Sequence, residues 1–242
     1  NLDRQRPGLN RGRPFPPPDA ILDGLRQGQS LLGADIQQSL EALCRVNARI
    51  IAAAPRRRLG EIAPLTRRPA TVDVMTEYPQ VSVRSFGRGT FHNPPLRGSE
   101  VTWEKPHLVK CGDLLVSNIK AWEGAFAVAG PHDDGRYGSH RYLTYVPDEA
   151  VLRARFLYLY LLSPEGLKAV GQASPGSADR NRTLNTKLFA EILVPTPRLE
   201  DQLALELAWE RIDAAQRRLT EMAAELDALL PAVLNRAFAG EL

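Results

Sequence analysis

Cysteine is scarce in this chain of 242 residues, which contains only two. Cys44 and Cys111 lie far apart, and neither has a second cysteine or a histidine at the spacing of metal ligands. We therefore expect no disulfide framework and no metal site, and the composition fits a reducing cytoplasm. We also expect this chain to hold no cofactor of its own.

Long apolar runs are missing as well. The longest, at residues 156–162, is far too short to cross a membrane, and no signal-peptide pattern opens the chain. We accordingly expect a cytoplasmic protein with no membrane partner. The first residue is Asn1 rather than methionine, which leaves open that the chain is a piece of something longer.

The motifs of common catalytic sites are also absent. The sequence has no Gly-Lys-Ser/Thr phosphate loop, no helix with paired histidines and no Gly-x-Ser-x-Gly. Residues 92–96 contain Asn-Pro-Pro, which resembles the Asn-Pro-Pro-aromatic tetrapeptide of adenine methyltransferases, whose aromatic ring stacks on a flipped base. Here Leu96 replaces the aromatic residue, and no Gly-rich strand–turn–helix for S-adenosylmethionine precedes it. We interpret this segment as a loop and expect no catalytic residue.

The charge balance is mildly basic, with 31 Lys and Arg against 28 Asp and Glu and a formal net charge of +3. That excess permits a nucleic-acid partner but does not establish one. Basic residues gather at 56–58, 67–68 and 180–182, whereas acidic residues concentrate towards the C-terminal end. The run at 56–58 fits a solvated face and a phosphate contact equally well.

The character of the sequence changes three times along the chain. Residues 1–19 are rich in Pro, Arg and Gly and predict a tail or linker. Residues 20–55 have helical periodicity, and we expect Gly33 to separate two helices and Pro55 to end the second. Residues 56–197 alternate short β-prone pieces with Gly/Pro turns, which predicts a mixed α/β globule.

Within the globule, the pattern predicts strands at 80–86, 113–119, 125–129, 141–146 and 192–194. Residues 120–124 are expected to join the second and third strands as a hairpin loop. We expect one helix over 152–162. Ser163, Pro164 and Glu165 predict the cap and first turn of another, which Gly171 should end.

The strongest periodic signal lies in residues 198–242. Apolar positions there alternate three- and four-residue steps, at Leu205, Ala208, Ile212, Ala215, Leu219, Met222, Leu226, Leu229 and Val233. A seam of this length favours a coiled coil, with an amphipathic helix packed on its own domain as the simpler alternative. We predict an α+β fold in which long helices flank the globule and form an antiparallel coiled coil. Self-association through the long helix stays open.

Six segments, in order along the chain, resemble the specificity subunit of Type I restriction–modification systems. They are residues 109–117, 121–125, 138–142, 176–184, 192–202 and 229–242, within a resemblance that spans about 56–242. It implies that 56–197 is a target recognition domain for double-stranded DNA and that 198–242 is a spacer helix. It also implies a modification (methyltransferase) subunit, which binds S-adenosylmethionine, and a restriction subunit as partners. The family's usual subunit has two recognition domains, whereas this chain has room for one and would read one half-site unless it dimerises.

The N-terminal segment resembles the C-terminal tail of the modification subunit of the same systems, at residues 1–7 and 18–22. This resemblance implies that the chain is the end of a fused methyltransferase–specificity protein.

Direct readout of DNA uses Arg or Lys for guanine and Asn or Gln for adenine, while other basic residues contact phosphates. The candidate DNA-binding residues lie in expected loops: Arg84, Arg88, Asn118, Lys120, Trp122, Ser139, His140, Arg141, Arg180, Asn181 and Arg182. Trp122 also fits a core residue, and His140 an ordinary surface residue. The strongest candidates are Arg180, Asn181 and Arg182, because two guanidinium groups and an amide in a loop have little packing purpose.

The leading hypothesis is therefore a non-catalytic DNA-recognition module that docks an adenine methyltransferase onto its target. Two alternatives remain. A complete or partial DNA adenine methyltransferase would bind S-adenosylmethionine by itself. A coiled-coil adaptor would assemble with a partner without binding nucleic acid.

Overall fold

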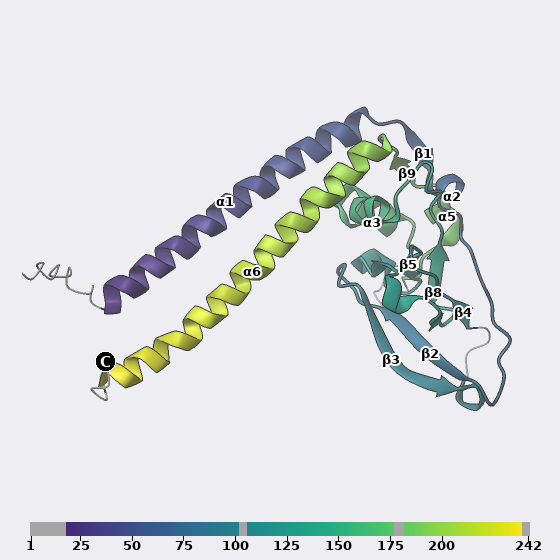
Figure 1. Cartoon of the computed structure of the whole chain (residues 1–242). Coiled ribbons are helices and arrows are strands. Elements are labelled where there is room, and N and C mark those ends of the chain that lie inside the picture. The colour runs from purple at the N-terminus through teal and green to yellow at the C-terminus, as the bar shows by residue number, and fades with distance from the viewer. Residues whose placement is uncertain (1–17, 102–105, 177–181, 239–242) are drawn as a thin grey trace, which may run out of the picture. The chain divides into compact units, whose positions relative to one another are not determined.

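The computed structural model describes residues 18–101, 106–176 and 182–238 (Figure 1). The chain divides into two compact units, one made of Asn1–Cys44 with Trp209–Leu242 and the other of Arg45–Ala208. Helices and strands are mixed in the chain, so the expected α+β class is confirmed.

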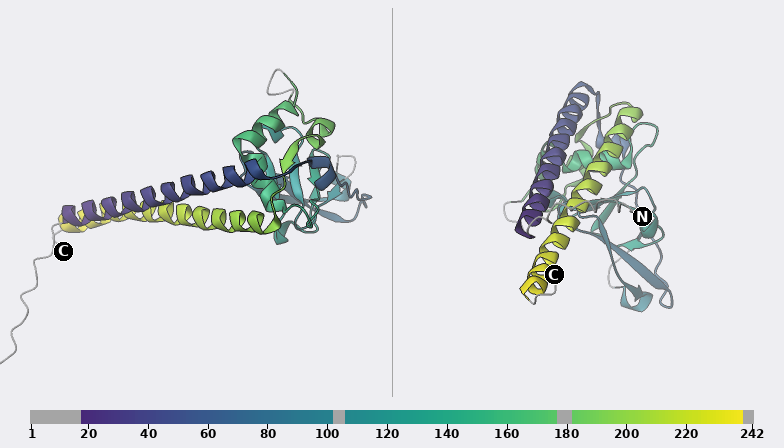
Figure 2. Two further views of the ribbon diagram at one scale, coloured as in Figure 1. Left: turned by 90° about the horizontal axis from the view of Figure 1, so that it is seen from above. Right: turned by 60° about the vertical axis from the view of Figure 1, so that its left-hand side comes forward.

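Two long helices supply the described part of the first unit. Helix α1 covers Pro18–Ala53 and helix α6 covers Leu199–Phe238. In this unit they run in opposite directions (Figures 1 and 2). The expected break at Gly33 is wrong, since α1 continues through it; one interior glycine costs only about 1 kcal/mol relative to alanine. The helix ends before Pro55, whose ring disfavours helical geometry at Ala54.

The seam of α6 is only partly described. Leu205 is buried, Ala208, Ala215 and Leu219 are half-buried, and Met222 is 51% exposed. Ile212, Leu226, Leu229 and Val233 lie outside the residues whose side chains are described. The coiled coil therefore stays a prediction.

The described residues of the second unit form three small sheets. Strands β1 (Arg56–Arg58) and β9 (Leu193–Pro195) form an antiparallel pair. A four-stranded sheet has the order β3-β2-β7-β4, with bounds Thr90–Arg97, Glu77–Val83, Tyr137–Gly138 and His107–Leu108. A three-stranded sheet has the order β6-β5-β8, with bounds Phe126–Val128, Leu114–Ser117 and Tyr142–Tyr145.

Strands β2, β5, β6, β8 and β9 fall within or close to the expected segments, and residues 120–124 join β5 to β6 as expected. The interpretation of residues 92–96 as a loop is wrong, because Asn93, Pro94 and Pro95 lie in β3. Strand β3 is at the edge of its sheet, where a proline that lacks an N–H is tolerated. Its pairing with β2 is irregular between Tyr78 and Gln80.

Short helices complete the second unit. They are α2 (Leu59–Ile62), α3 (Ala154–Leu162), α4 (Pro164–Gln172) and α5 (Thr186–Ala190), with 3-10 turns η1 (Gly98–Glu100), η2 (Ala121–Glu123) and η3 (Pro131–Asp133). The expected cap is confirmed, since the Ser163 hydroxyl accepts a hydrogen bond from the Gly166 N–H at 3.2 Å. Helix α4 extends one residue past Gly171.

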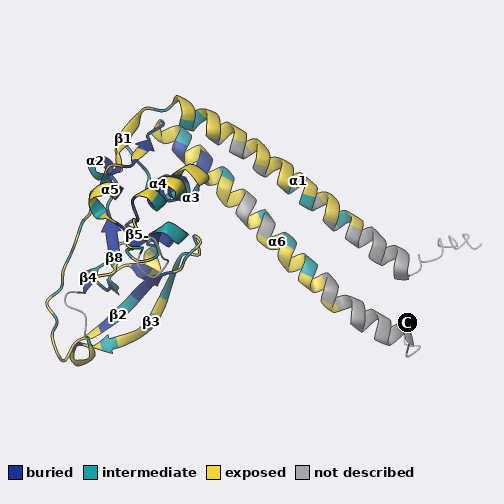
Figure 3. Cartoon of the chain, turned by 180° about the vertical axis from the view of Figure 1, so that it is seen from behind, coloured by how far each residue is buried: buried dark blue, intermediate teal, exposed yellow. Residues whose placement is uncertain are grey.

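The core of the second unit includes both the side of the three-stranded sheet that faces α3 and a cluster that β5 and β6 form with β2 (Figure 3). Its largest fully buried side chains include Leu114, Phe126, Tyr145, Leu157 and Phe189. The buried positions of β5 are continuous rather than alternating, as expected for a strand covered on both faces. This core fixes the loops at the ends of β2, β5 and β8, which carry most of the candidate residues.

The first turns of α6 belong to this unit and are attached by buried polar groups. Gln202 is fully buried; its amide donates to the Val151 and Pro197 carbonyls and its oxygen accepts from the Arg153 N–H at 2.9 Å. Glu206 accepts from the Phe156 N–H at 3.0 Å and from the Arg153 guanidinium at 2.7 Å. The Glu206 carboxylate thus satisfies an N–H in the first turn of α3, where the helix dipole favours negative charge.

Candidate nucleic-acid interface

The tip of the β2–β3 hairpin carries two of the candidate arginines. Phe86, Gly87 and Gly89 turn the chain there with positive φ angles of 62°, 61° and 75°. The Arg84 guanidinium lies 4.8 Å from the centre of the Phe91 ring, and that of Arg88 lies 5.7 Å from the centre of the Phe86 ring. Each arginine is therefore paired with an aromatic face at distances typical of cation–π contacts.

Backbone hydrogen bonds fasten this tip to the loop that contains η2. The Phe86 N–H donates to the Glu123 carbonyl and the Gly87 N–H to the Gly124 carbonyl, both at 2.9 Å. The Tyr158 hydroxyl of α3 donates to the Gly87 carbonyl at 2.7 Å. Residues far apart in the sequence are thus held in one fixed surface.

We expect Gly87→Ala to destabilise the protein by about 2 kcal/mol, through the left-handed backbone and a steric clash. A Cβ on Gly87 would lie 2.6 Å from Leu162 Cδ1 and 3.1 Å from the Tyr158 hydroxyl. Gly89→Ala is the matched control, because Gly89 also has positive φ but no atom within 4 Å of its Cβ position. Urea unfolding should show the larger loss of stability for Gly87→Ala, and equal losses would contradict the close approach.

Two cations contact the ring of Trp122. The Arg182 guanidinium is 4.5 Å from its ring centre, and the Lys120 ammonium is 5.2 Å from a ring centre of the same side chain. Trp122 is half-buried, and its indole N–H is buried without a hydrogen-bond partner among the described residues. The side chain is therefore partly a packing element and partly a platform for the two cations.

Glu123 holds this arrangement in place. It accepts hydrogen bonds from the Lys120 ammonium at 2.6 Å and from the Ser85 hydroxyl at 2.9 Å. The pKa of Glu123 lies below its ordinary value, chiefly because of the hydrogen bond from Lys120. Glu123 is therefore ionised at neutral pH and neutralises part of the positive charge around it.

A further cation and ring extend the surface along α3, where the Arg155 guanidinium lies 4.9 Å from the centre of the Tyr158 ring. We call the set linked by these contacts the cationic–aromatic cluster. Its members are Arg84, Phe86, Arg88, Phe91, Lys120, Trp122, Arg155, Tyr158 and Arg182.

A shallow polar groove of about 470 Å³ contains a second group of candidates. Ser139, His140 and Arg141 line it together with Gln80, Ser82, Ser117 and other residues of β2 and the ends of β5 and β8. The Asn118 N–H donates to the Arg141 carbonyl at 2.7 Å, and the Asn118 carbonyl accepts from the Leu184 N–H at 2.8 Å. Asn118 thus connects the groove to the segment that carries Arg182.

The structure brings most of the sequence candidates into these two groups. Arg84, Arg88, Lys120, Trp122 and Arg182 belong to the cluster, while Ser139, His140 and Arg141 line the groove beside Asn118. Arg180 and Asn181 lie outside the described residues. The expectation that Arg182 has little packing purpose is wrong, since its guanidinium donates to the Gly171 and Ser174 carbonyls and lies on Trp122.

Sequence reasoning missed several members of both groups. Phe86, Phe91, Arg155 and Tyr158 of the cluster were not predicted, nor were Gln80 and Ser82 of the groove. A signal existed for Phe86, which stands between two arginines next to a glycine. Arg155 and Tyr158 carry no comparable signal, because their helix reads as buried core.

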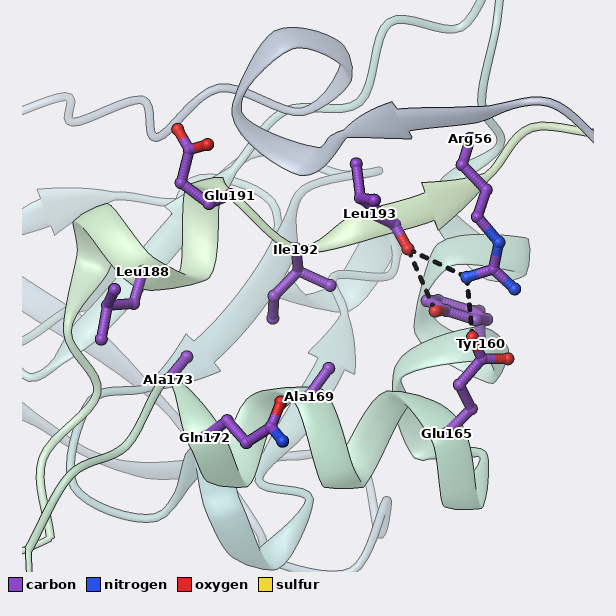
Figure 4. Close-up of a pocket in the computed structure, with 10 residues that line it drawn as sticks. All are labelled: Arg56, Tyr160, Glu165, Ala169, Gln172, Ala173, Leu188, Glu191, Ile192 and Leu193. Carbon is purple, nitrogen blue, oxygen red and sulfur yellow. Dashed lines mark hydrogen bonds and ion pairs between the residues drawn. The ribbon is translucent and has the colours of Figure 1, made fainter.

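A second cavity, of about 380 Å³, lies between α4, α5 and β9 (Figure 4). Arg56 forms an ion pair there with Glu165 at 2.7 Å, and this hydrogen bond is the main reason that the pKa of Arg56 is raised. Arg58 pairs with Glu191 at 3.1 Å. The basic run at 56–58 thus contributes two arginines to ion pairs within the unit, which weakens its interpretation as a phosphate contact.

Across the described segments, no group of three His, Cys, Asp or Glu residues is placed to hold a metal ion. None of the helices in the described part of the chain is long and apolar enough to cross a membrane.

Comparison with solved structures finds the same fold elsewhere. The chain matches the HsdS subunit from Thermoanaerobacter tengcongensis with a TM-score of 0.55 and 20% identity, over 93% of this chain and 56% of that one. A structure concerned with complex assembly and conformational transition of the type I R-M system matches with a TM-score of 0.59 and 20% identity, over 93% of this chain and 57% of that one. The Type I restriction–modification S subunit from M. genitalium matches with a TM-score of 0.51 and 14% identity, over 87% of this chain and 58% of that one.

No protein-family model and no curated protein matches the sequence. The chain spans between 56% and 58% of the length of these structural neighbours. The cluster and the groove therefore lie on a domain whose chain has the fold of Type I restriction–modification specificity subunits.

Proposed function

We propose that this chain recognises a DNA sequence within a Type I restriction–modification system and presents it to an adenine methyltransferase subunit. The observation that carries the proposal is the cationic–aromatic cluster beside a polar groove, on a domain with the fold of specificity subunits. A chain of this kind needs no catalytic residue and no cofactor of its own. S-adenosylmethionine would be bound by the partner.

The chemistry of the two groups supports separate roles on duplex DNA. The cations of the cluster suit phosphates, whose contacts supply affinity and fix the register. The groove offers groups that read base edges, namely the Arg141 guanidinium, the Ser139 hydroxyl and the oxygen of the Gln80 amide. The Gln80 amide nitrogen donates to the Pro94 carbonyl at 2.9 Å. We assign base recognition chiefly to the groove.

The long helices supply the proposed docking surface for the methyltransferase, with a restriction subunit as a further partner. Support comes from the extended apolar seam of α6 and from neighbours that belong to Type I systems. A second copy of the chain, associated through the same helices, would provide the other half-site.

A selection experiment tests DNA recognition. The full chain is incubated with a library of duplexes randomised over a central window, and bound duplexes are sequenced over several rounds. We expect one motif to be enriched, and we expect the affinity for it to fall steeply with salt because bound phosphates release counterions. Enrichment of no sequence, with binding independent of salt, would contradict the proposal and favour the adaptor. S-adenosylmethionine binding by the chain alone would favour the methyltransferase.

Substitution of Arg182 separates base recognition from phosphate binding. Arg182→Ala should weaken binding to the enriched duplex by about 1–3 kcal/mol if the side chain reads a base. Arg182→Lys keeps the positive charge but loses the planar guanidinium with its several hydrogen-bond donors. It should therefore bind the duplex more tightly than Arg182→Ala only if the side chain binds a phosphate. Arg57→Ala, at an exposed arginine of β1, is the control. Wild-type affinity of Arg182→Ala for every duplex tested would remove Arg182 from the site.

A further inference from the structure

Phe86 combines two costly features. Its φ of 62° is in the left-handed region, which is unfavourable for a bulky side chain. The residue is also 68% exposed, so the ring gains little from burial in its own domain. Glycine would adopt the same backbone angle without the penalty.

The surrounding hydrogen bonds keep this conformation in place. Those from the Phe86 and Gly87 N–H groups to the η2 loop, and from the Tyr158 hydroxyl to Gly87, fix the backbone on both sides. The phenyl ring is therefore presented at the hairpin tip by a backbone that cannot relax locally. A strained residue that its neighbours hold in place is typical of a functional position.

The charges around the ring indicate what it meets. Arg88 contacts Phe86 directly. The rest of the cluster adds four more cations, of which Lys120 is paired with the Glu123 carboxylate. Duplex DNA provides both a polyanion for the cations and flat base faces for the ring.

We propose that Phe86 is a wedge that inserts at a base step of the bound duplex and partly unstacks it. This inference rests on the proposed DNA recognition and adds a specificity-determining residue to it. Pyrimidine–purine steps unstack most readily, so the wedge selects sequences with such a step at its position. The remaining cluster holds the flanking phosphates while the step opens.

Fluorescence of 2-aminopurine tests the wedge. The base analogue replaces adenine at a pyrimidine–purine step of the duplex that the wild-type chain enriches, with one probe duplex for each such step. Wild-type binding should raise the fluorescence at one step, because unstacking relieves quenching. Phe86→Ala should abolish that rise and weaken binding about tenfold, since an aromatic–base stack is worth about that factor.

Two further variants separate binding from folding. Phe86→Gly should raise the midpoint of thermal unfolding, because glycine relieves the backbone strain, while it weakens DNA binding as much as alanine does. Leu188→Ala is the control, at another apolar side chain that is 48% exposed, and it should change neither the affinity nor the fluorescence.

The possible failures can be told apart. Phe86→Ala binding with wild-type affinity and an unchanged fluorescence rise would overturn the wedge and leave DNA recognition intact. No fluorescence rise at any step with the wild-type chain would also overturn it. Loss of co-purification with a co-expressed methyltransferase subunit, at unchanged DNA affinity, would instead assign Phe86 to a protein interface. If the wild-type chain enriches no duplex, the proposed function and the wedge fail together.

Discussion

Glu206→Ala is expected to lower the free energy of unfolding by about 3 kcal/mol, because the carboxylate makes two buried or partly buried charge-assisted hydrogen bonds. Glu206 is 4% exposed and accepts from the Phe156 N–H in the first turn of α3 and from the Arg153 guanidinium. Alanine would leave the buried N–H without an acceptor. For a domain of this size, the change corresponds to a fall of roughly 6–12 °C in the midpoint of thermal unfolding.

The matched control is Glu210→Ala, at an exposed glutamate one turn further along the same helix. Its free energy of unfolding should stay within about 0.5 kcal/mol of the wild type. The two variants have the same net charge and remove the same side chain, so a difference between them measures the buried hydrogen bonds. Equal stability of Glu206→Ala and the wild type would contradict this attachment of the first turns of α6 within the second unit.

Neutralisation of the cluster should have the largest effect on DNA binding. The salt dependence of binding is measured as the slope of the logarithm of the binding constant against the logarithm of the salt concentration. The triple variant Arg84→Gln, Arg88→Gln, Lys120→Gln should make this slope shallower by about one unit for each phosphate that it no longer neutralises. The affinity at low salt should fall at least about a hundredfold, because most non-specific affinity comes from the neutralisation of phosphates. Electrophoretic mobility shift or fluorescence anisotropy at several salt concentrations measures both quantities.

An equal reduction of charge elsewhere on the unit separates local binding from net charge. The control variant Arg57→Gln, Arg58→Gln, Lys168→Gln removes three exposed cations of β1 and α4. We expect it to retain most of the affinity and the slope of the wild type. Similar effects of both triple variants would indicate attraction by overall charge and would argue against a defined surface at the cluster.

Local signals in the sequence predicted much of the secondary structure. The cap at Ser163, the β5–β6 hairpin and the long terminal helix depend on neighbours within a few residues, and all three occur in the structure. The edge strand β3 was missed because its two prolines argue against a strand unless its place at the edge is known. That place depends on long-range pairing, which periodicity does not report.

In the candidate site, too, the sequence indicated what depends on local residues and missed what depends on long-range contacts. Residue types in loops pointed to Lys120 and Arg141, but no local pattern could show that Arg182 lies on Trp122 or that Tyr158 fixes the hairpin tip. The pair Tyr158 and Gly87 is separated by 71 positions along the chain. The assignment of Arg182 as an unpacked loop residue failed because its partners, the Gly171 and Ser174 carbonyls, are made available only by the end of α4.

Methylome sequencing tests the central claim most directly. Cells that carry the gene are compared with cells that lack it and with cells complemented by the cluster triple variant. If the chain selects the target of an adenine methyltransferase, methylation of one adenine-containing motif should disappear on deletion, return with the wild-type gene, and stay low with the triple variant. An identical set of methylated motifs in all of these cells would contradict the proposed role in DNA recognition.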